Sequence, residues 1–167
     1  MYERGAADIA HPGGTLLAHL QRVRARLARW DARPALQLAG LCHACYGTDG
    51  FPTALLSLER RTVLAEVIGA EAEALVHLYA SCDRHATYPT LAEPGGAFRD
   101  RFTGGLHVPS AQQRRDVAEL TAANELDLAD IDPVFRGQAR IGLLILFTRL
   151  RPLLSGPARA DCRSLLE

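Results

Sequence analysis

Two histidines and one aspartate are the residues of this chain best suited to chemistry. His19 falls in an amphipathic segment, His43 in an almost wholly apolar one, and Asp83 just after a third. Imidazole and carboxylate are the usual protein ligands of zinc, iron and manganese, and a buried histidine needs a polar partner. The three side chains are predicted to converge on one divalent cation that keeps an open position for water or substrate.

Two further interpretations of His43 stay open. In the first, His43 is a metal-free general acid or base, and Asp83 orients its ring. In the second, His43 has only a structural hydrogen bond, to a backbone carbonyl or to Asp83, and His19 is half exposed. The spacing of the three residues is compatible with all of these arrangements.

Polar residues that follow His43 are candidates for the wall of the same pocket. Tyr46 and Asp49 are predicted to take part in proton transfer, and Thr48 to bind the ligand. Gly47 is also suited to end a helix, so the Tyr-Gly-Thr sequence has a purely structural alternative as a turn.

A cation and two polar residues further along the chain complete the predicted site. Arg84 directly follows Asp83, and its guanidinium can hold a phosphate, sulfate or carboxylate group through two parallel hydrogen bonds. Asn124 and Glu125 come late in an apolar helical segment. They either reach the pocket or cap the end of that helix.

The pair Cys42 and Cys45 has the C-x-x-C spacing of redox and zinc sites. No βαβ pattern surrounds it and no second pair accompanies it, so neither site is supported. On a helix the two thiols lie on one face, where they are predicted to be core residues. Four cysteines in 167 residues are too few for a disulfide scaffold, which favours a reducing compartment.

The elements that must position these residues are predicted to be helical. Apolar residues recur at helical spacing, and no alternating strand pattern stands out. The fold class is therefore all-α, a single domain over residues 1–167 with six or seven helices, of which one short helix finishes the chain. The others are predicted over residues 15–30, 35–46, 56–68, 70–82, 110–126 and 132–154.

Two segments fall outside this helical pattern. Residues 1–13 are predicted to be a flexible N-terminal segment. Residues 85–109 are rich in proline and glycine and are predicted to form a long irregular loop, of the length that often serves as a lid over a binding site.

Composition excludes several classes of partner. Nineteen arginines, with no lysine, balance nineteen acidic residues, so the chain lacks the positive charge that binding to nucleic acid requires. The longest apolar run, residues 141–147, is far shorter than the roughly 20 residues that span a bilayer. The sequence predicts a soluble cytoplasmic protein without a membrane partner.

The stretches HLQRVRARL, LAGLCHACYG and LYASCDR resemble the His…His-Asp…Asp pattern of the HD-domain superfamily. The resemblance implies an all-helical, HD-domain-like bundle related to metal-dependent phosphohydrolases and a minority of di-iron oxygenases. His19 takes the position of the first histidine, His43 that of the second, and Asp83 that of the last aspartate. Ala44 stands where the superfamily has the aspartate of its His-Asp pair, so the bridging carboxylate of a dinuclear centre is missing.

A narrower resemblance extends over roughly residues 11–130. The segments TLLAHL, AGLCHACYGTDGF, IGAEAEALVHLYASCDR and LTAANELDL are similar to a family of small uncharacterised bacterial proteins with a His-x-x-Tyr-Gly-Thr signature. That family is also identified as lacking the aspartate of the His-Asp pair. It implies no established activity.

Two functions from different classes follow. The first is an enzyme that acts on a small anionic metabolite by hydrolysis, elimination or cyclisation, as a tailoring step in a bacterial biosynthetic pathway, with His43 and Asp83 at its centre. Its cofactor would be a single divalent ion or none. The second is a non-catalytic ligand-binding or partner subunit, in which the apolar helix over residues 132–154 forms a homodimer or a heteromeric contact.

Overall fold

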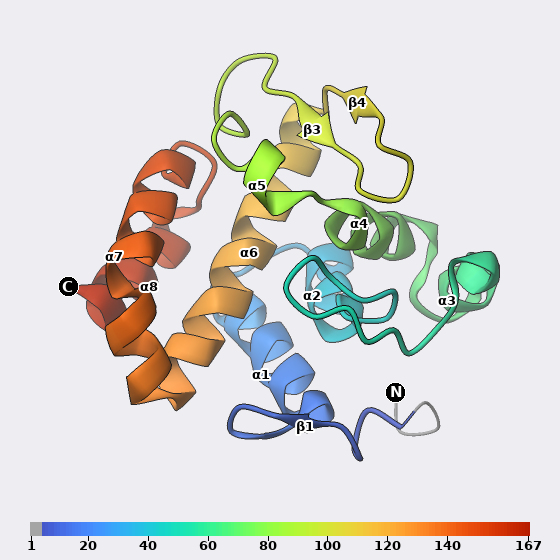
Figure 1. Cartoon of the computed structure of the whole chain (residues 1–167), viewed down its shortest axis with the longest axis horizontal. Helices are drawn as coiled ribbons and strands as arrows, with labels where there is room; N and C mark the ends of the chain where they lie inside the picture. Colours follow the sequence, from blue (N-terminus) through green and yellow to red (C-terminus); the bar gives the residue numbers. More distant parts are fainter. Residues whose placement is uncertain (1–4) are drawn as a thin grey trace.

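Eight α-helices carry most of residues 5–167, the part of the chain described by this computed structural model (Figure 1). The all-α prediction is confirmed, and the two β-hairpins are small. The helices are α1 (Leu16–Arg29), α2 (Pro34–Cys42), α3 (Arg61–Ile68), α4 (Ala70–Ser81), α5 (Arg84–Thr87), α6 (Ala111–Ile131), α7 (Pro133–Leu150) and α8 (Gly156–Leu166). A 3₁₀ turn, η2 (Leu58–Arg60), precedes α3; β1 (Ala10–His11) pairs with β2 (Gly14–Thr15), and β3 (Phe98–Arg99) with β4 (Leu106–His107), both antiparallel.

Side chains at the predicted helix starts satisfy the free backbone N–H groups there. The Thr15 hydroxyl accepts from the first turn of α1, and Ser110 forms a reciprocal capping box with Gln113 at the start of α6. Asp132 accepts two backbone N–H groups of α7, which begins with Pro133. These three helix starts therefore agree with the predicted helices over residues 15–30, 110–126 and 132–154.

Helix α2 ends earlier than the sequence predicts, at Cys42 rather than at residue 46. The next residues form turns, and the Cys45 carbonyl accepts hydrogen bonds from the N–H groups of both Leu55 and Leu56, each at 2.9 Å. Helical bonding past Cys42 would give the Gly40 carbonyl to the N–H of Ala44, but this carbonyl accepts from His43 Nδ1 at 2.8 Å. The Cys45 N–H donates three residues back, to the Cys42 carbonyl, so the α-helical pattern ends. His43 consequently lies at the C-cap of α2 instead of inside it.

Helix α6 is the centre of the bundle and packs against α1, α2, α4, α7 and α8 (Figure 1). Most of its residues are buried, including Asp116, Glu119, Asn124 and Asp127. A buried carboxylate requires a partner, and each has one; Asp116 pairs with Arg33, for example. The helix that fills the core therefore also carries polar groups to its centre.

The N-terminal hairpin packs against α1. Residues 1–4 of the segment predicted to be flexible lie outside the described residues. Residues 5–13 are held in place: Ala6 is fully buried and its carbonyl accepts from the N–H of Leu17, while Arg22 donates to the Pro12 carbonyl. Helix α1 thus fixes the position of the hairpin.

Gly13, in the turn of this hairpin, is expected to tolerate no larger residue. Its φ is +77°, and a β-carbon there would lie 2.2 Å from Ile131 Cγ2. We expect Gly13→Ala to lower the free energy of unfolding by about 1–3 kcal/mol more than Gly5→Ala, measured with urea. Gly5 is the matched control because its φ is +75° in open space. Equal losses would mean that the hairpin is not packed closely against Ile131.

The cysteines agree with their predicted role, since Cys42, Cys45, Cys82 and Cys162 are all reduced and buried. In the part of the chain described, no helix combines the length and apolarity needed to cross a membrane.

Candidate functional site

A pocket of about 390 Å³ opens where the β1–β2 hairpin, the start of α1, the loop after α2 and the second half of α6 meet. Its floor is apolar, with Leu16, Phe51 and Leu128. Its polar lining residues come from segments far apart in the sequence: His11, His19, His43, Thr48, Arg84, Asn124, Glu125 and Asp132. Concentration of histidines in a pocket of this size makes it the candidate site.

The His19 ring is fixed by a buried aspartate of α6. His19 Nδ1 donates to Asp127 Oδ2 over 2.7 Å, and both groups are almost inaccessible to solvent. Arg22, one turn after His19 on α1, donates to both oxygens of the same carboxylate, at 2.8 and 2.9 Å. Asp127 is therefore a carboxylate shared between one imidazole and one guanidinium.

Opposing influences act on the pKa of Asp127. Burial is the largest single influence and raises this pKa. The hydrogen bonds from His19 and Arg22, together with their charges, lower it by more in total, so the net pKa lies below the ordinary value of 3.8. The carboxyl group is therefore ionised at neutral pH. An ionised Asp127 can only accept hydrogen bonds, so His19 Nδ1 must carry a proton.

The second imidazole, His43, has the opposite character. Its Nδ1 donates to the Gly40 carbonyl over 2.8 Å, which leaves Nε2 with its lone pair. Burial, and then the nearby His19, lower the pKa of His43 to about 3. His43 is therefore neutral at physiological pH, with its ring centroid 5.3 Å from that of His19.

Asn124 joins the two histidines. Its Oδ1 faces His19 Nε2 at 3.1 Å, its NH₂ group donates to Glu125 Oε1, and its side chain lies near enough to His43 to act on the pKa of that ring. Donation from Nδ1 to Asp127 and from Nε2 to Asn124 would make both ring nitrogens of His19 donors, as in an imidazolium. A neutral His19 would instead require the Asn124 amide to turn over and present its NH₂ group.

Arg84 is a cation in the wall of the same pocket. Its guanidinium donates to Glu125 Oε1 and to the Tyr79 hydroxyl, each at 3.1 Å. It passes so close to Gly50 that a β-carbon there would lie 3.3 Å from Arg84 Nη1. The site thus contains a largely buried arginine with donor groups left over for a ligand.

His11 covers the pocket from the N-terminal hairpin. Its ring stacks on that of His19, with centroids 4.2 Å apart, and meets Phe51 edge-on. Burial, followed by the charge of His19, lowers the pKa of His11 to about 4. His11 is therefore a lining residue of the pocket.

Asp83 lies away from the predicted site. Its carboxylate caps the short helix α5 by accepting from the N–H of Ala86, and it faces Arg99 at 3.6 Å. It does not line the pocket that contains His19 and His43. The prediction that Asp83 joins these histidines is therefore corrected: the aspartate at the end of α4 is used for helix capping, and His19 takes Asp127 as its partner.

Tyr46 and Asp49 also lie outside the pocket. The Tyr46 hydroxyl donates to buried Glu73 on α4, over 2.9 Å, and Arg61 donates to the same carboxylate. Asp49 is exposed and accepts from the backbone N–H of Arg84. Both residues stabilise loops around the site.

The other predicted ligand-binding residues do lie in the pocket wall: Thr48, Arg84, Asn124 and Glu125.

The segment 85–109 does not cover this pocket, since none of its residues lines it. It is largely irregular, as predicted, but it has its own buried anchors, Leu91 and Phe98, and Arg114 of α6 donates to the Glu93 carbonyl. The cover over the histidines is the β1–β2 hairpin instead.

The predicted metal ligands His19, His43 and Asp83 are not assembled. Within residues 5–167, no three His, Cys, Asp or Glu side chains are grouped as a cation would require. Ala44 supplies no bridging carboxylate, and Asp83 caps α5. The residues present therefore do not fit the metal centre that the HD resemblance implies.

Sequence reasoning missed Asp127 and Arg22, which hold His19. One signal was available. Asn124 and Asp127 are three residues apart on an apolar helix, so they share a face, and a buried helix has little reason to carry an acid there unless a cation meets it. What could not be inferred was which histidine that face would meet.

The geometry defines an all-helical protein with a histidine-lined pocket built around an Asp–His pair. The chain belongs to the family described as Domain of unknown function (DUF6817), whose model matches residues 1–84. Among curated proteins and solved structures nothing matches the chain. The matched residues include His11, His19, His43 and Arg84, while the α6 side of the pocket lies beyond them.

Proposed function

We propose that this pocket catalyses proton transfer on a small organic anion, most simply an elimination. The observation that carries the proposal is the pairing of two adjacent imidazoles in opposite electrostatic surroundings. His19 donates to the carboxylate of Asp127, whose negative charge favours an imidazolium, and His43 is kept neutral by burial. Titratable groups whose environments favour opposite protonation states are suited to act as acid and base in one reaction.

His43 Nε2 has the lone pair needed by a general base. Its low pKa makes it a weak base in the empty pocket, but a bound anion would stabilise its protonated form and raise that pKa. His19 Nε2–H, which faces Asn124, has the proton needed by a general acid. The 5.3 Å between the ring centroids suits proton removal and proton donation at neighbouring substrate atoms.

Arg84 is the residue we propose to hold the anionic group of the substrate. Glu125 and Tyr79 fix its guanidinium but use only part of its five N–H donors. A carboxylate bound there would also stabilise negative charge that develops on the neighbouring carbon as its proton leaves.

The proposed step begins when His43 Nε2 takes a proton from a carbon next to the bound carboxylate. The electrons of that C–H bond form a carbon–carbon double bond. The C–O bond on the adjacent carbon breaks, its oxygen takes the Nε2 proton of His19, and water leaves. Exchange with solvent then restores both histidines.

We also propose that the chain shares an ancestor with the HD-domain superfamily. This ancestry is supported by the placement of His19 on α1 and His43 at the end of α2 as neighbours in one pocket. Cytoplasmic location, a tailoring role in biosynthesis, and a homodimer or heteromeric assembly stay predictions from the sequence.

Deuterium exchange tests the proposal with a panel of small hydroxycarboxylates. The panel is incubated with the protein in D₂O, and loss of the C–H signal next to the carboxylate, or appearance of an alkene, is followed by NMR. We expect at least one member to react with wild type. His43→Asn, whose amide can still donate to Gly40, should slow that reaction by about 10²-fold or more.

The matched control is His85→Asn, because His85 is an exposed histidine of α5 outside the pocket. It should react like wild type. A panel member that shifts the imidazole signals of His19 and His43 but neither exchanges nor converts would contradict the catalytic proposal and favour a ligand-binding protein. If no hydroxycarboxylate binds, this substrate class is excluded.

A further inference from the structure

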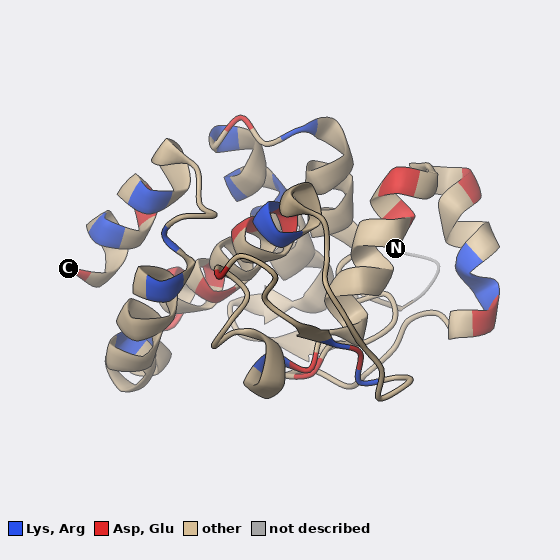
Figure 2. Cartoon of the chain, turned by 90° about the horizontal axis from the view of Figure 1, so that it is seen from above, with Lys and Arg blue, Asp and Glu red and all other residues tan. Residues whose placement is uncertain are grey.

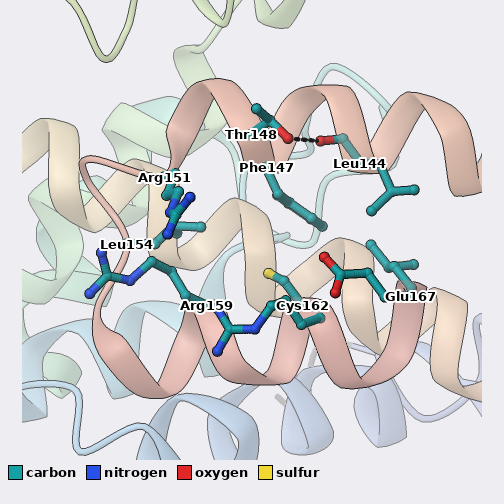
Figure 3. Close-up of a pocket in the computed structure, with 10 residues that line it drawn as sticks. Leu144, Phe147, Thr148, Arg151, Leu154, Arg159, Cys162 and Glu167 are labelled. Atoms are coloured by element: carbon teal, nitrogen blue, oxygen red, sulfur yellow. Dashed lines mark hydrogen bonds between the residues drawn. The ribbon is translucent and has the colours of Figure 1, made fainter.

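A second pocket lies between α7 and α8, outside the residues matched by the family model. Phe147 reaches into it from α7 and Cys162 from α8 (Figure 3). Leu154 and Leu166 complete its apolar floor. Burial raises the pKa of the Cys162 thiol to about 12, so the thiol is uncharged and adds to the apolar surface. The volume of this pocket is about 150 Å³.

Three arginines line this pocket: Arg151, Arg159 and Arg163. In the part of the chain that the structure describes, none of the three guanidinium groups has an ion-pair or hydrogen-bond partner. This differs from Arg22, Arg33 and the other arginines of the core, which are paired with carboxylates. Figure 3 shows Arg151 and Arg159 towards one end of the pocket and Glu167 at the other.

The charge of the whole C-terminal helical pair agrees with this local excess. Residues 133–167 contain six arginines and two acidic residues, a formal charge of +4 in a chain whose net charge is zero. Figure 2 shows mostly blue bands on the two helices beside the C-terminus. Of the two acids, Asp161 is engaged with Trp30 and Arg26, so it does not neutralise the pocket.

We propose that the α7–α8 pocket is a second binding site, for a small organic carboxylate with one ring or a short branched chain. The apolar floor would take the hydrocarbon part, since a cavity of about 150 Å³ holds roughly one benzene ring. The unpaired arginines at its rim would hold the carboxylate. This site is separate from the histidine pocket and does not depend on the function proposed for it.

The test is titration of the full chain with 4-fluorobenzoate, followed by ¹⁹F NMR of the probe and ¹H–¹⁵N NMR of the protein. We expect a Kd of about 1 mM or below, and chemical-shift changes confined to α7 and α8. Arg159→Gln and Arg163→Gln should each weaken binding by about tenfold. Arg149→Gln is the matched control, because Arg149 is an exposed arginine of α7 that does not line the pocket.

Two further probes separate the two parts of the proposal. 4-Fluorobenzyl alcohol has the ring without the charge, and inorganic phosphate has charge without the ring. Both should bind at least about tenfold more weakly than 4-fluorobenzoate. Equal binding of either probe, equal effects of the control and test variants, shift changes centred on His19 and His43, or no binding of 4-fluorobenzoate would each overturn the proposal.

Discussion

Asp127→Asn is expected to remove about 3–5 kcal/mol from the free energy of unfolding and to reduce turnover at the histidine pocket by about 10²–10⁴-fold. The carboxylate accepts from His19 and, through both oxygens, from Arg22. An asparagine would present an NH₂ group to one of these donors and leave buried positive charge without its counter-ion. Urea unfolding measures the first effect, and the deuterium-exchange rate the second.

The control for this variant is Glu71→Gln, which removes the exposed ion pair with Arg33 and should change stability by no more than about 1 kcal/mol. The effect of Asp127→Asn should also depend on pH. Because the folded pKa of Asp127 is lowered, its stabilising contribution is present above the unfolded pKa of about 3.9 and is lost as pH falls through the folded pKa. A wild-type advantage that persists unchanged well below pH 4 would contradict the assignment of Asp127 as the counter-ion.

Acid should destabilise the folded protein well above the pH at which its carboxyl groups are protonated, and His43 should be a main cause. The unfolded histidine binds a proton near pH 6.5, whereas the pKa of buried His43 is lowered to about 3. Between these values the unfolded state binds more protons, so stability falls as pH falls. The full contribution is about 5 kcal/mol, of which about 2–3 kcal/mol is lost between roughly pH 6.5 and 4.5.

His43→Asn removes this titration while keeping a donor for the Gly40 carbonyl. The free energy of unfolding of this variant should therefore change less between pH 7 and 4.5 than that of wild type, by about 2–3 kcal/mol. His11, whose pKa is lowered to about 4, adds to the slope in the same direction and stays in both proteins. Parallel pH profiles for wild type and His43→Asn would mean that His43 binds its proton at the same pH in the folded and unfolded states, which would contradict its burial as a neutral imidazole.

Local signals predicted the helices well. The caps Thr15, Ser110 and Asp132 are short-range features, and each begins the helix that it was predicted to begin. The end of α2 was mispredicted because the apolar pattern continues to residue 46, whereas the structure gives the Gly40 carbonyl to the His43 side chain and holds the turn after it through the N–H groups of Leu55 and Leu56.

The candidate site was predicted only in part, for a related reason. His19, His43, Arg84 and Asn124 could be selected by type and by the apolar character of their segments. The hydrogen-bond partners of the buried histidines could not be identified by type, because a buried histidine requires a polar partner but its own sequence does not indicate which acid supplies it. Asp83 was the acid suggested by the order of a known motif, and the packing of α6 against α1 supplied Asp127 instead.

The pairing of α1 with α6 has a consequence for how the chain acquires its structure. His19 and Asp127 are separated by 108 positions, so their contact closes a very long loop, and contacts of this kind slow folding. At ribosomal rates of about 5–20 residues per second, His19 and Arg22 are synthesised roughly 5–20 s before their shared carboxylate. Helix α1 can form early from local interactions, but its polar face has no counter-ion until α6 has been made. The histidine pocket is therefore expected to be among the last parts of the molecule to form during synthesis.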